Sequence, residues 1–143
     1  MLRAIGGVVV GYVAMFICIF TLFTLAYLVL GANGAFQPGS YEVSGIWLVL
    51  VAIVSGVAAV VGGFVCKLIA RNSGAVYALL ALVLVLGVVF GIAGANKVVP
   101  PVRANEVANI EAMQNAKTPV WMMLLGLVIS GAGVVVGARL KRD

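Results

Sequence analysis

The sequence has no histidine and very little charge. Only nine of its 143 residues are Lys or Arg, and four are Asp or Glu. Histidine is the most frequent general base in enzymes and a common ligand of haem iron and catalytic zinc. Since no other catalytic or metal-ligand motif replaces it, we predict no catalytic residues, no metal and no cofactor. The chain is expected not to be an enzyme.

Charge is almost absent from four long apolar runs, which cover residues 4–30, 44–68, 74–95 and 119–138. Lys67, next to the end of the second run, is the one exception. Each run has about the 20 residues that a helix needs to cross a bilayer. The sequence therefore predicts an all-α fold, a four-helix bundle of transmembrane helices that forms a single domain over residues 1–143. Proton-coupled exporters and rotor-ring proteolipids are excluded, because they need a carboxylate deep within a span.

The few charges are divided unequally between the two ends of the predicted bundle. One end carries basic residues opposed only by Asp143, namely Arg3, Lys67, Arg71, Arg139, Lys141 and Arg142. The other end carries charges that cancel, namely Glu42, Lys97, Arg103, Glu106, Glu111 and Lys117. Basic residues stay on the cytoplasmic side of a membrane. We therefore predict cytoplasmic N- and C-termini in a bacterial inner membrane, with anionic lipid rather than nucleic acid facing the basic end.

The two halves of the chain share an order of short motifs. Gly-Ala-Asn at 31–33 recurs at 94–96, a tryptophan follows in each half, and Ser-Gly at 55–56 recurs at 130–131. Each half then ends in basic residues. The order indicates a duplicated helical hairpin with both copies in the same orientation. Chance matching between helices rich in Ala, Val and Gly is the alternative.

Small residues recur at four-residue spacing in every predicted span. The positions that we predict to form helix-packing or oligomer seams are Gly7, Gly11, Ser55, Ala59, Gly63, Gly87, Gly91, Gly133 and Gly137. Small side chains let helix backbones approach closely within lipid. The seams serve either packing within one chain or contact with another membrane protein or a second copy. On the second interpretation, leucine at positions 133 and 137 should weaken association more than folding.

The segment 103–116 is the largest polar stretch between spans. It contains neither Gly nor Pro, and Val107, Ile110 and Met113 fall on one face of a helix. That spacing predicts an amphipathic helix on the outer surface, resting on the membrane or on a partner. We predict these three side chains to be the partner-docking residues.

Two functions remain open on the sequence alone. The first is a non-catalytic accessory or scaffold subunit that packs in a larger membrane assembly, since packing motifs occur on all spans and catalytic motifs on none. The alternative is a small homo-oligomeric permease or channel for neutral or lipophilic solutes. Such a path would narrow at Ser55 and Ser130, polar side chains near mid-membrane in the second and fourth spans. Hydroxyls in lipid more often bond to their own helix or to a neighbour.

Overall fold

The structure is a computed structural model that describes residues 1–103 and 107–141. Its four long helices are α1 (Leu2–Ala35), α2 (Gly45–Ala70), α3 (Ser73–Ala95) and α5 (Val120–Leu140), and α4 (Asn109–Asn115) is a short fifth helix. The four long helices are apolar and long enough to cross a membrane. The predicted all-α, four-helix membrane bundle is therefore confirmed.

The predicted spans match the helices within two residues, except that α1 runs five residues further, to Ala35 rather than residue 30. At Gly31 the chain takes a φ of 65° and a ψ of 180°, which breaks the helical geometry inside α1. Glycine adopts a positive φ without steric penalty. The last turn of α1, after Gly31, therefore runs in a new direction. The helix is kinked close to residue 30, where the sequence predicted that it would end.

Local sequence explains where α2 and α3 begin. The Trp47 backbone N–H donates to the hydroxyl of Ser44 at 3.2 Å, which caps α2. The Gly74 N–H donates to the side chain of Asn72 at 2.6 Å, which caps α3. Between these helices Arg71 adopts the left-handed conformation and ends α2. Ser and Asn are favoured caps because their side-chain oxygens satisfy the first free N–H groups of a helix.

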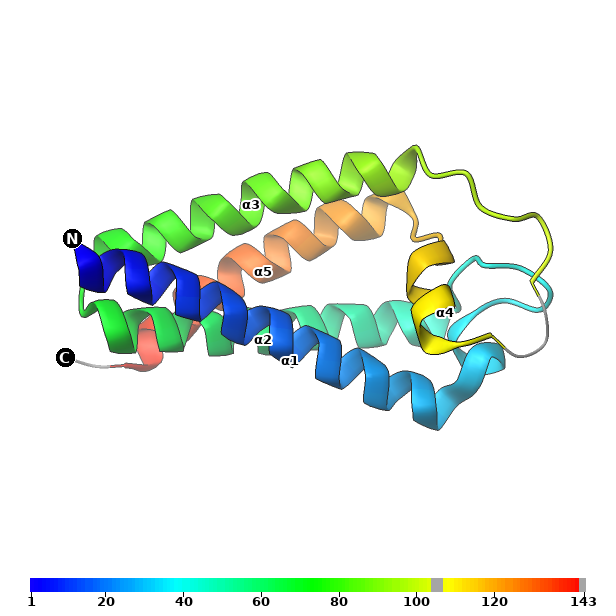
Figure 1. Ribbon diagram of the computed structural model, residues 1–143, viewed down its shortest axis with the longest axis horizontal. Helices are drawn as coiled ribbons and strands as arrows, with labels where there is room; N and C mark the ends of the chain where they lie inside the picture. Colours follow the sequence, from blue (N-terminus) through cyan, green and yellow to red (C-terminus); the bar gives the residue numbers. More distant parts are fainter. Residues whose placement is uncertain (104–106, 142–143) are drawn as a thin grey trace.

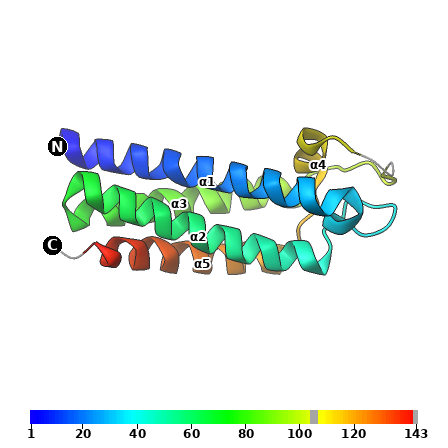
Figure 2. The same ribbon diagram turned by 90° about the horizontal axis from the view of Figure 1, so that it is seen from below.

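Helix α2 lies at the centre of the bundle. It packs against α1, α3 and α5, whereas α1 and α5 do not contact each other over the described residues. Figures 1 and 2 show the four helices running side by side, with both termini at one end. We call this the basic end, because it also carries Lys67, Arg71 and Arg139. The opposite end carries the two long loops and α4, and we call it the cap end.

The bundle opens toward the cap end. In Figure 1, α3 and α1 diverge from left to right, and α4 lies at the wide end between them. The buried residues of α3 are Ala75, Val76 and Leu79, all in its first two turns. After Leu79, α3 has no buried residue, and more than half of its positions are exposed.

Two separate apolar clusters hold the structure together. The first surrounds Cys66 and Leu79 and joins all four long helices in the half near the basic end. The second lies at the cap end and combines aromatic and small side chains of both long loops, α1 and α4, among them Tyr27, Phe36 and Tyr41. The cap is thus a packed element with a core of its own.

Candidate functional site: the cap and its cavity

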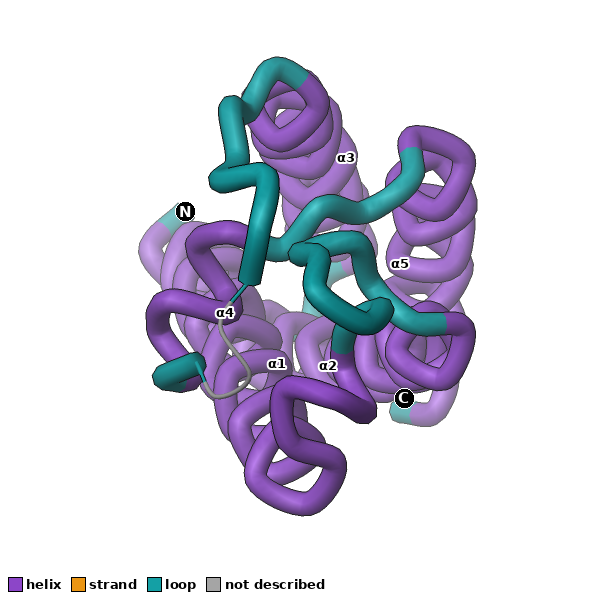
Figure 3. Tube along the Cα trace, turned by 90° about the vertical axis from the view of Figure 1, so that its right-hand side faces the viewer, coloured by secondary structure: helices purple, strands orange, loops and turns teal. Residues whose placement is uncertain are grey.

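The cap consists of residues 36–44, Arg103 and residues 107–118, which lie over the ends of α1 and α2. Figure 3 views it end-on, with the loops crossing above the helices. Short backbone pairings join its segments: Phe36 pairs with Val43 in antiparallel fashion, and Glu42 pairs with Lys117 in parallel fashion. The turn between the first pair contains Gly39 at a φ of 70°. These pairings bring together loops that are far apart in the sequence.

Arg103 lies inside the cap with only 4% of its surface exposed. Its Nε donates to the Ser40 carbonyl at 2.9 Å, and a terminal nitrogen donates to the Asn33 side chain at 3.2 Å. The guanidinium group also lies 5.5 Å from the centre of the Phe36 ring. Arginine suits such a site because its planar fork makes several directed hydrogen bonds and stacks on aromatic rings. Arg103 therefore fastens the second long loop to the first.

A hydroxyl–carboxylate contact makes a second link between the loops. The Tyr41 hydroxyl donates to Glu111 Oε1 at 3.0 Å. Burial raises the pKa of this phenol, and the hydrogen bond to Glu111 and the charge of that carboxylate raise it further, while Arg103 acts in the opposite direction. Tyr41 therefore stays a neutral hydrogen-bond donor under physiological conditions, which makes it a structural residue rather than a proton donor.

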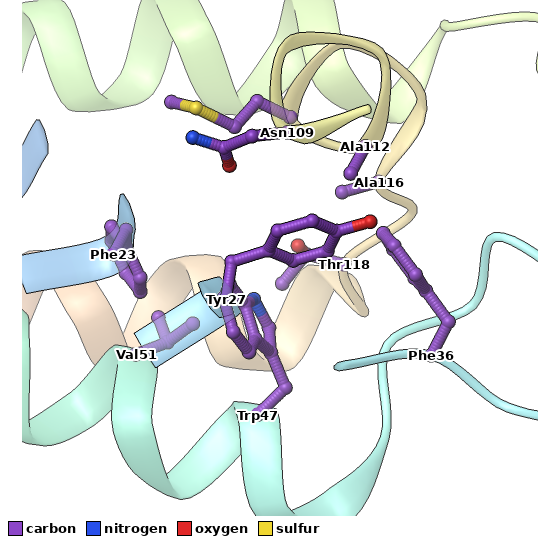
Figure 4. Close-up of a pocket in the computed structure, with 10 residues that line it drawn as sticks. Phe23, Tyr27, Phe36, Trp47, Val51, Asn109, Ala112, Ala116 and Thr118 are labelled. Carbon is purple, nitrogen blue, oxygen red and sulfur yellow. The ribbon is translucent and has the colours of Figure 1, made fainter. Parts of the chain in front are cut away.

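A cavity of about 250 Å³ lies beneath α4. Tyr27 and Trp47 meet edge to face in its wall, with ring centres 6.3 Å apart, and Phe23 stacks on Trp47 at 5.5 Å. Figure 4 shows these rings below Asn109, Ala112 and Ala116. The Tyr27 hydroxyl donates to the Val107 carbonyl at 2.5 Å. The cavity is apolar, with few polar groups, and suits an alkyl chain or a small neutral ring rather than an ion.

The predicted amphipathic helix over 103–116 is wrong in extent. Only Asn109–Asn115 is helical, residues 104–106 lie outside the described part of the chain, and Arg103 is buried in the cap rather than placed on a surface helix. The contacts of the neighbouring residues explain the late start. The Tyr27 hydroxyl holds the Val107 carbonyl, and the Asn109 amide donates to Thr24 Oγ1 at 3.2 Å. These bonds fix the chain in an extended form before α4 begins.

The three predicted docking residues are placed differently from one another. Val107 packs against the cap cluster and is half-buried. Ile110 and Met113 remain exposed, at 65% and 43% of their surface. Ala112 turns inward instead and is buried. Ile110 is therefore open to a partner, while Met113 lines the aromatic cavity and keeps part of its surface exposed beside it.

The seams on α1 and α2 face each other within the chain. A Cβ built on Gly7 would lie 2.7 Å from Ala70 Cβ, and one built on Gly11 would lie 2.9 Å from the Gly62 carbonyl oxygen. Gly62, which the spacing alone did not single out, faces α1 in the same way, because a Cβ built there would overlap the Met15 side chain and lie 3.0 Å from the Gly11 carbonyl oxygen. The backbones of α1 and α2 thus approach so closely that a methyl group would not fit.

The other side of α2 packs on α5 in the same way. A Cβ on Gly133 would lie 2.6 Å from Ala59 Cβ, while Gly63 and Gly137 face backbone atoms of Val134 and Val60. Gly133 and Gly137 are therefore buried within one chain, and the cost of leucine at these positions falls on folding rather than on association.

The seam on α3 is less tight, and the serines lie apart from every cavity that we describe. Gly87 faces the Leu127 side chain of α5, and a Cβ on Gly91 would lie 3.8 Å from the sulfur of Met123. Side chains rather than backbone therefore separate α3 from α5. Ser55 and Ser130 are half-buried, and they line neither the aromatic cavity nor a second cavity that lies beside Lys67 and Arg139 at the basic end.

Within residues 1–103 and 107–141, no group of three or more Cys, Asp or Glu side chains is placed to hold a metal ion. Glu111 is exposed and bonded to Tyr41, and Cys18 and Cys66 are free thiols within the helices.

Comparisons of the chain with protein-family models, with curated proteins and with solved structures find no match. The cap presents a fixed surface, and its cavity can hold an apolar ligand. Its described residues include no nucleophile paired with a general base.

Proposed function

We propose that this chain is a non-catalytic accessory or scaffold subunit that docks on another membrane protein through its cap. One observation carries the proposal: Ile110 and Met113 are exposed apolar side chains on α4, outside the four spans, and α4 sits on a rigid, hydrogen-bonded base. Apolar side chains on the spans are surrounded by lipid, whereas apolar side chains outside the hydrocarbon layer are exposed to water unless another surface buries them. A partner subunit that packs on Ile110 and Met113 would bury this pair.

The position of α4 supports the same proposal. Thr24 and Tyr27 of α1 bond to the chain where α4 begins, and Tyr41 bonds to Glu111 of α4, so that α4 is held in one place before any partner arrives. A preformed surface loses little conformational entropy on binding. The buried Arg103 contributes indirectly, because it bonds to the residue before Tyr41.

The docking proposal is tested by a double substitution on α4. Ile110→Ser combined with Met113→Ser should reduce recovery of the native complex after mild solubilisation about tenfold or more, because buried apolar side chains dominate such contacts. The matched control is Leu2→Ser with Ile5→Ser, two exposed apolar residues at the opposite end. Complex size is measured by native electrophoresis, with partners identified by mass spectrometry. Equal recovery for both double variants, or a strictly monomeric parent protein, contradicts the proposal.

We further propose that both termini are cytoplasmic and that the cap faces the outside of a bacterial inner membrane. The cluster of basic residues at the end that holds the termini supports this orientation. With Cys18 and Cys66 replaced by Ala, a cysteine at Gln37 should react with an impermeant thiol reagent in intact cells. A cysteine at Leu2 should react only after the cells are opened; the reverse pattern contradicts the orientation.

A permease for neutral solutes is the second candidate, and the geometry favours it less. It would require a path at the level of Ser55 and Ser130, yet α2 packs at this level through Ala58 and Ala59, which are fully buried. The cavities that we describe lie toward the two ends of the bundle. If several copies of the chain formed a path between them, Ser55→Leu would reduce the measured solute flux. A scaffold subunit conducts no solute, so the same substitution would leave the flux unchanged.

A further inference from the structure

The aromatic cavity beneath α4 extends from the cap into the adjoining part of the spans. Tyr27 and Trp47 form its wall next to the cap, and Phe23 and Val51 continue that wall one helical turn further along α1 and α2. One turn of an α-helix advances about 5.4 Å. The cavity therefore has one end at the cap and the other end among apolar side chains of the spans.

The end of the cavity at the cap has a polar lining, made by Asn109 of α4 and by Thr118. The side-chain nitrogen of Asn109 already donates to Thr24 Oγ1 at 3.2 Å. The side-chain oxygen of Asn109 is turned the other way, toward the rings of Tyr27 and Trp47 (Figure 4). An amide oxygen accepts hydrogen bonds and cannot donate them. This end of the cavity thus presents an acceptor directly above an apolar wall.

We propose that the cavity binds a lipid alcohol, that is, an apolar molecule whose polar end is a single hydroxyl group. The hydroxyl donates to the Asn109 side-chain oxygen, and the chain or ring attached to it lies between Phe23, Trp47 and Val51. A dry apolar cavity of roughly 150 Å³ takes up benzene, so that the space of about 250 Å³ accommodates a ring or several methylene groups. This inference does not depend on the docking role of the cap.

The position of the cavity indicates a lipid rather than a solute dissolved in water. Phe23 and Val51 belong to helices that are long and apolar enough to cross a membrane, and both side chains are half-buried, so each keeps surface that protein does not cover. Tyr and Trp are typical of the membrane–water interface, which puts Asn109 at the level of lipid headgroups. A lipid alcohol has the same order, with its hydroxyl at the interface and its apolar part below.

Trp47 reports binding because its ring lines the cavity. The chain has two tryptophans, so that Trp121→Phe leaves Trp47 as the single fluorophore. Trp47→Phe leaves Trp121, which is 57% exposed on α5 and reports probe that merely dissolves in the surrounding detergent. The full chain in a neutral detergent is titrated with a brominated long-chain alcohol, whose bromine quenches tryptophan fluorescence. The corresponding brominated carboxylate and brominated alkane are titrated in parallel.

We expect the alcohol to quench Trp47 saturably and to bind about tenfold more tightly than the alkane, because it gains one hydrogen bond. The carboxylate should bind more weakly than the alcohol, since it offers only acceptors to the Asn109 oxygen. Quenching of Trp121 should rise without saturation. A carboxylate or an alkane that binds as tightly as the alcohol overturns the proposal.

Two substitutions separate the Asn109 oxygen from the structural role of this residue. Asn109→Leu should remove the preference for the alcohol over the alkane. Thr24→Val breaks the same hydrogen bond between α4 and α1 but leaves the amide in place, and it should keep the preference. An equal loss of the preference in both variants contradicts the assignment of Asn109.

The place of binding is tested by filling the cavity. Val51→Phe should abolish saturable quenching, whereas Val49→Phe, at a position of α2 that is 60% exposed, should leave it unchanged. If Val51→Phe does not purify as a helical protein by circular dichroism, Ala116→Leu fills the cavity from the cap instead. Equal quenching in the filled and control variants shows that the cavity is not the site. Displacement of the long-chain alcohol by an equal concentration of benzyl alcohol overturns the assignment to a lipid.

Discussion

Replacing Gly137 by alanine is expected to destabilise the bundle by about 3 kcal/mol, the upper part of the usual range for overpacking a core. The added Cβ would collide with the carbonyl oxygen of Val60, and backbone atoms cannot rotate away as a side chain can. Helices α2 and α5 must separate, and the buried packing around Val134 and Ala59 is weakened with them. The free energy of unfolding is measured by titrating the detergent-solubilised protein with sodium dodecyl sulfate and following the loss of near-ultraviolet circular dichroism.

Gly126 supplies the matched control in the same helix. A Cβ built there meets nothing within 4 Å. Gly126→Ala should therefore be neutral or stabilise α5 by about 0.5 kcal/mol, because alanine loses less backbone entropy in a helix than glycine does. If the two variants unfold at the same detergent fraction, the close α2–α5 contact is not present in the membrane. If Gly137→Leu leaves a folded chain and changes only the size of the assembly, the seam lies between chains instead.

Arg103→Ala is expected to release the cap while leaving the four spans intact. The Ser40 carbonyl and the Asn33 side chain each lose a charged donor, and the Phe36 ring loses the cation stacked on it. Hydrogen bonds to charged groups and a buried cation–π contact together contribute about 3 kcal/mol. Local opening of the loop over residues 36–44 should become roughly a hundredfold more frequent, since each 1.4 kcal/mol corresponds to a factor of ten.

Limited proteolysis in reconstituted vesicles measures this opening. A broad-specificity protease should cut the Arg103→Ala variant within residues 36–44, as identified by mass spectrometry, at a rate close to a hundredfold above the parent. Arg103→Lys should fall between them, because lysine keeps the charge but loses the planar fork. Lys97→Ala removes an exposed cation of the same loop and should leave the cleavage rate unchanged. An unchanged cleavage rate in Arg103→Ala would show that the cap does not depend on this side chain.

The spans followed from the sequence because run length and exclusion of charge act on every residue of a membrane helix. The seams could be predicted from small residues at four-residue spacing. That spacing shows which face of a helix packs closely, but not which helix packs against it. Gly133 fits against Ala59 only because α2 lies at the centre of the bundle, and no local pattern fixes that order. The hairpin duplication stays a prediction, and the two hairpins pack unlike each other: backbone meets backbone in the first, and Leu127 and Met123 intervene in the second.

The cap could not be predicted because its stability comes from contacts across 60 residues or more of sequence. Arg103 resembles any other loop cation, and its burial depends on Ser40 and Asn33, which come to it from the first loop. Likewise, the periodicity of Val107, Ile110 and Met113 indicated a helix, but hydrogen bonds from Tyr27 and Asn109 to distant partners shortened it. Lys67 differs from Arg103 in this respect, because the hydrogen bond that it donates reaches only as far as Ser73 at the start of α3.

The central place of α2 also governs the order in which the chain can assemble during its synthesis. Once residues 1–70 have left the ribosome, α1 and α2 can insert as a hairpin and complete the contact of Gly7 and Gly11 with α2. The opposite side of α2, with Ala59 and Gly63, then stays uncovered by protein while α3 and the second long loop are synthesised. Only α5, the last span to emerge, covers it. A chain whose synthesis stops after α3 therefore lacks the helix that covers the Ala59 and Gly63 side of α2.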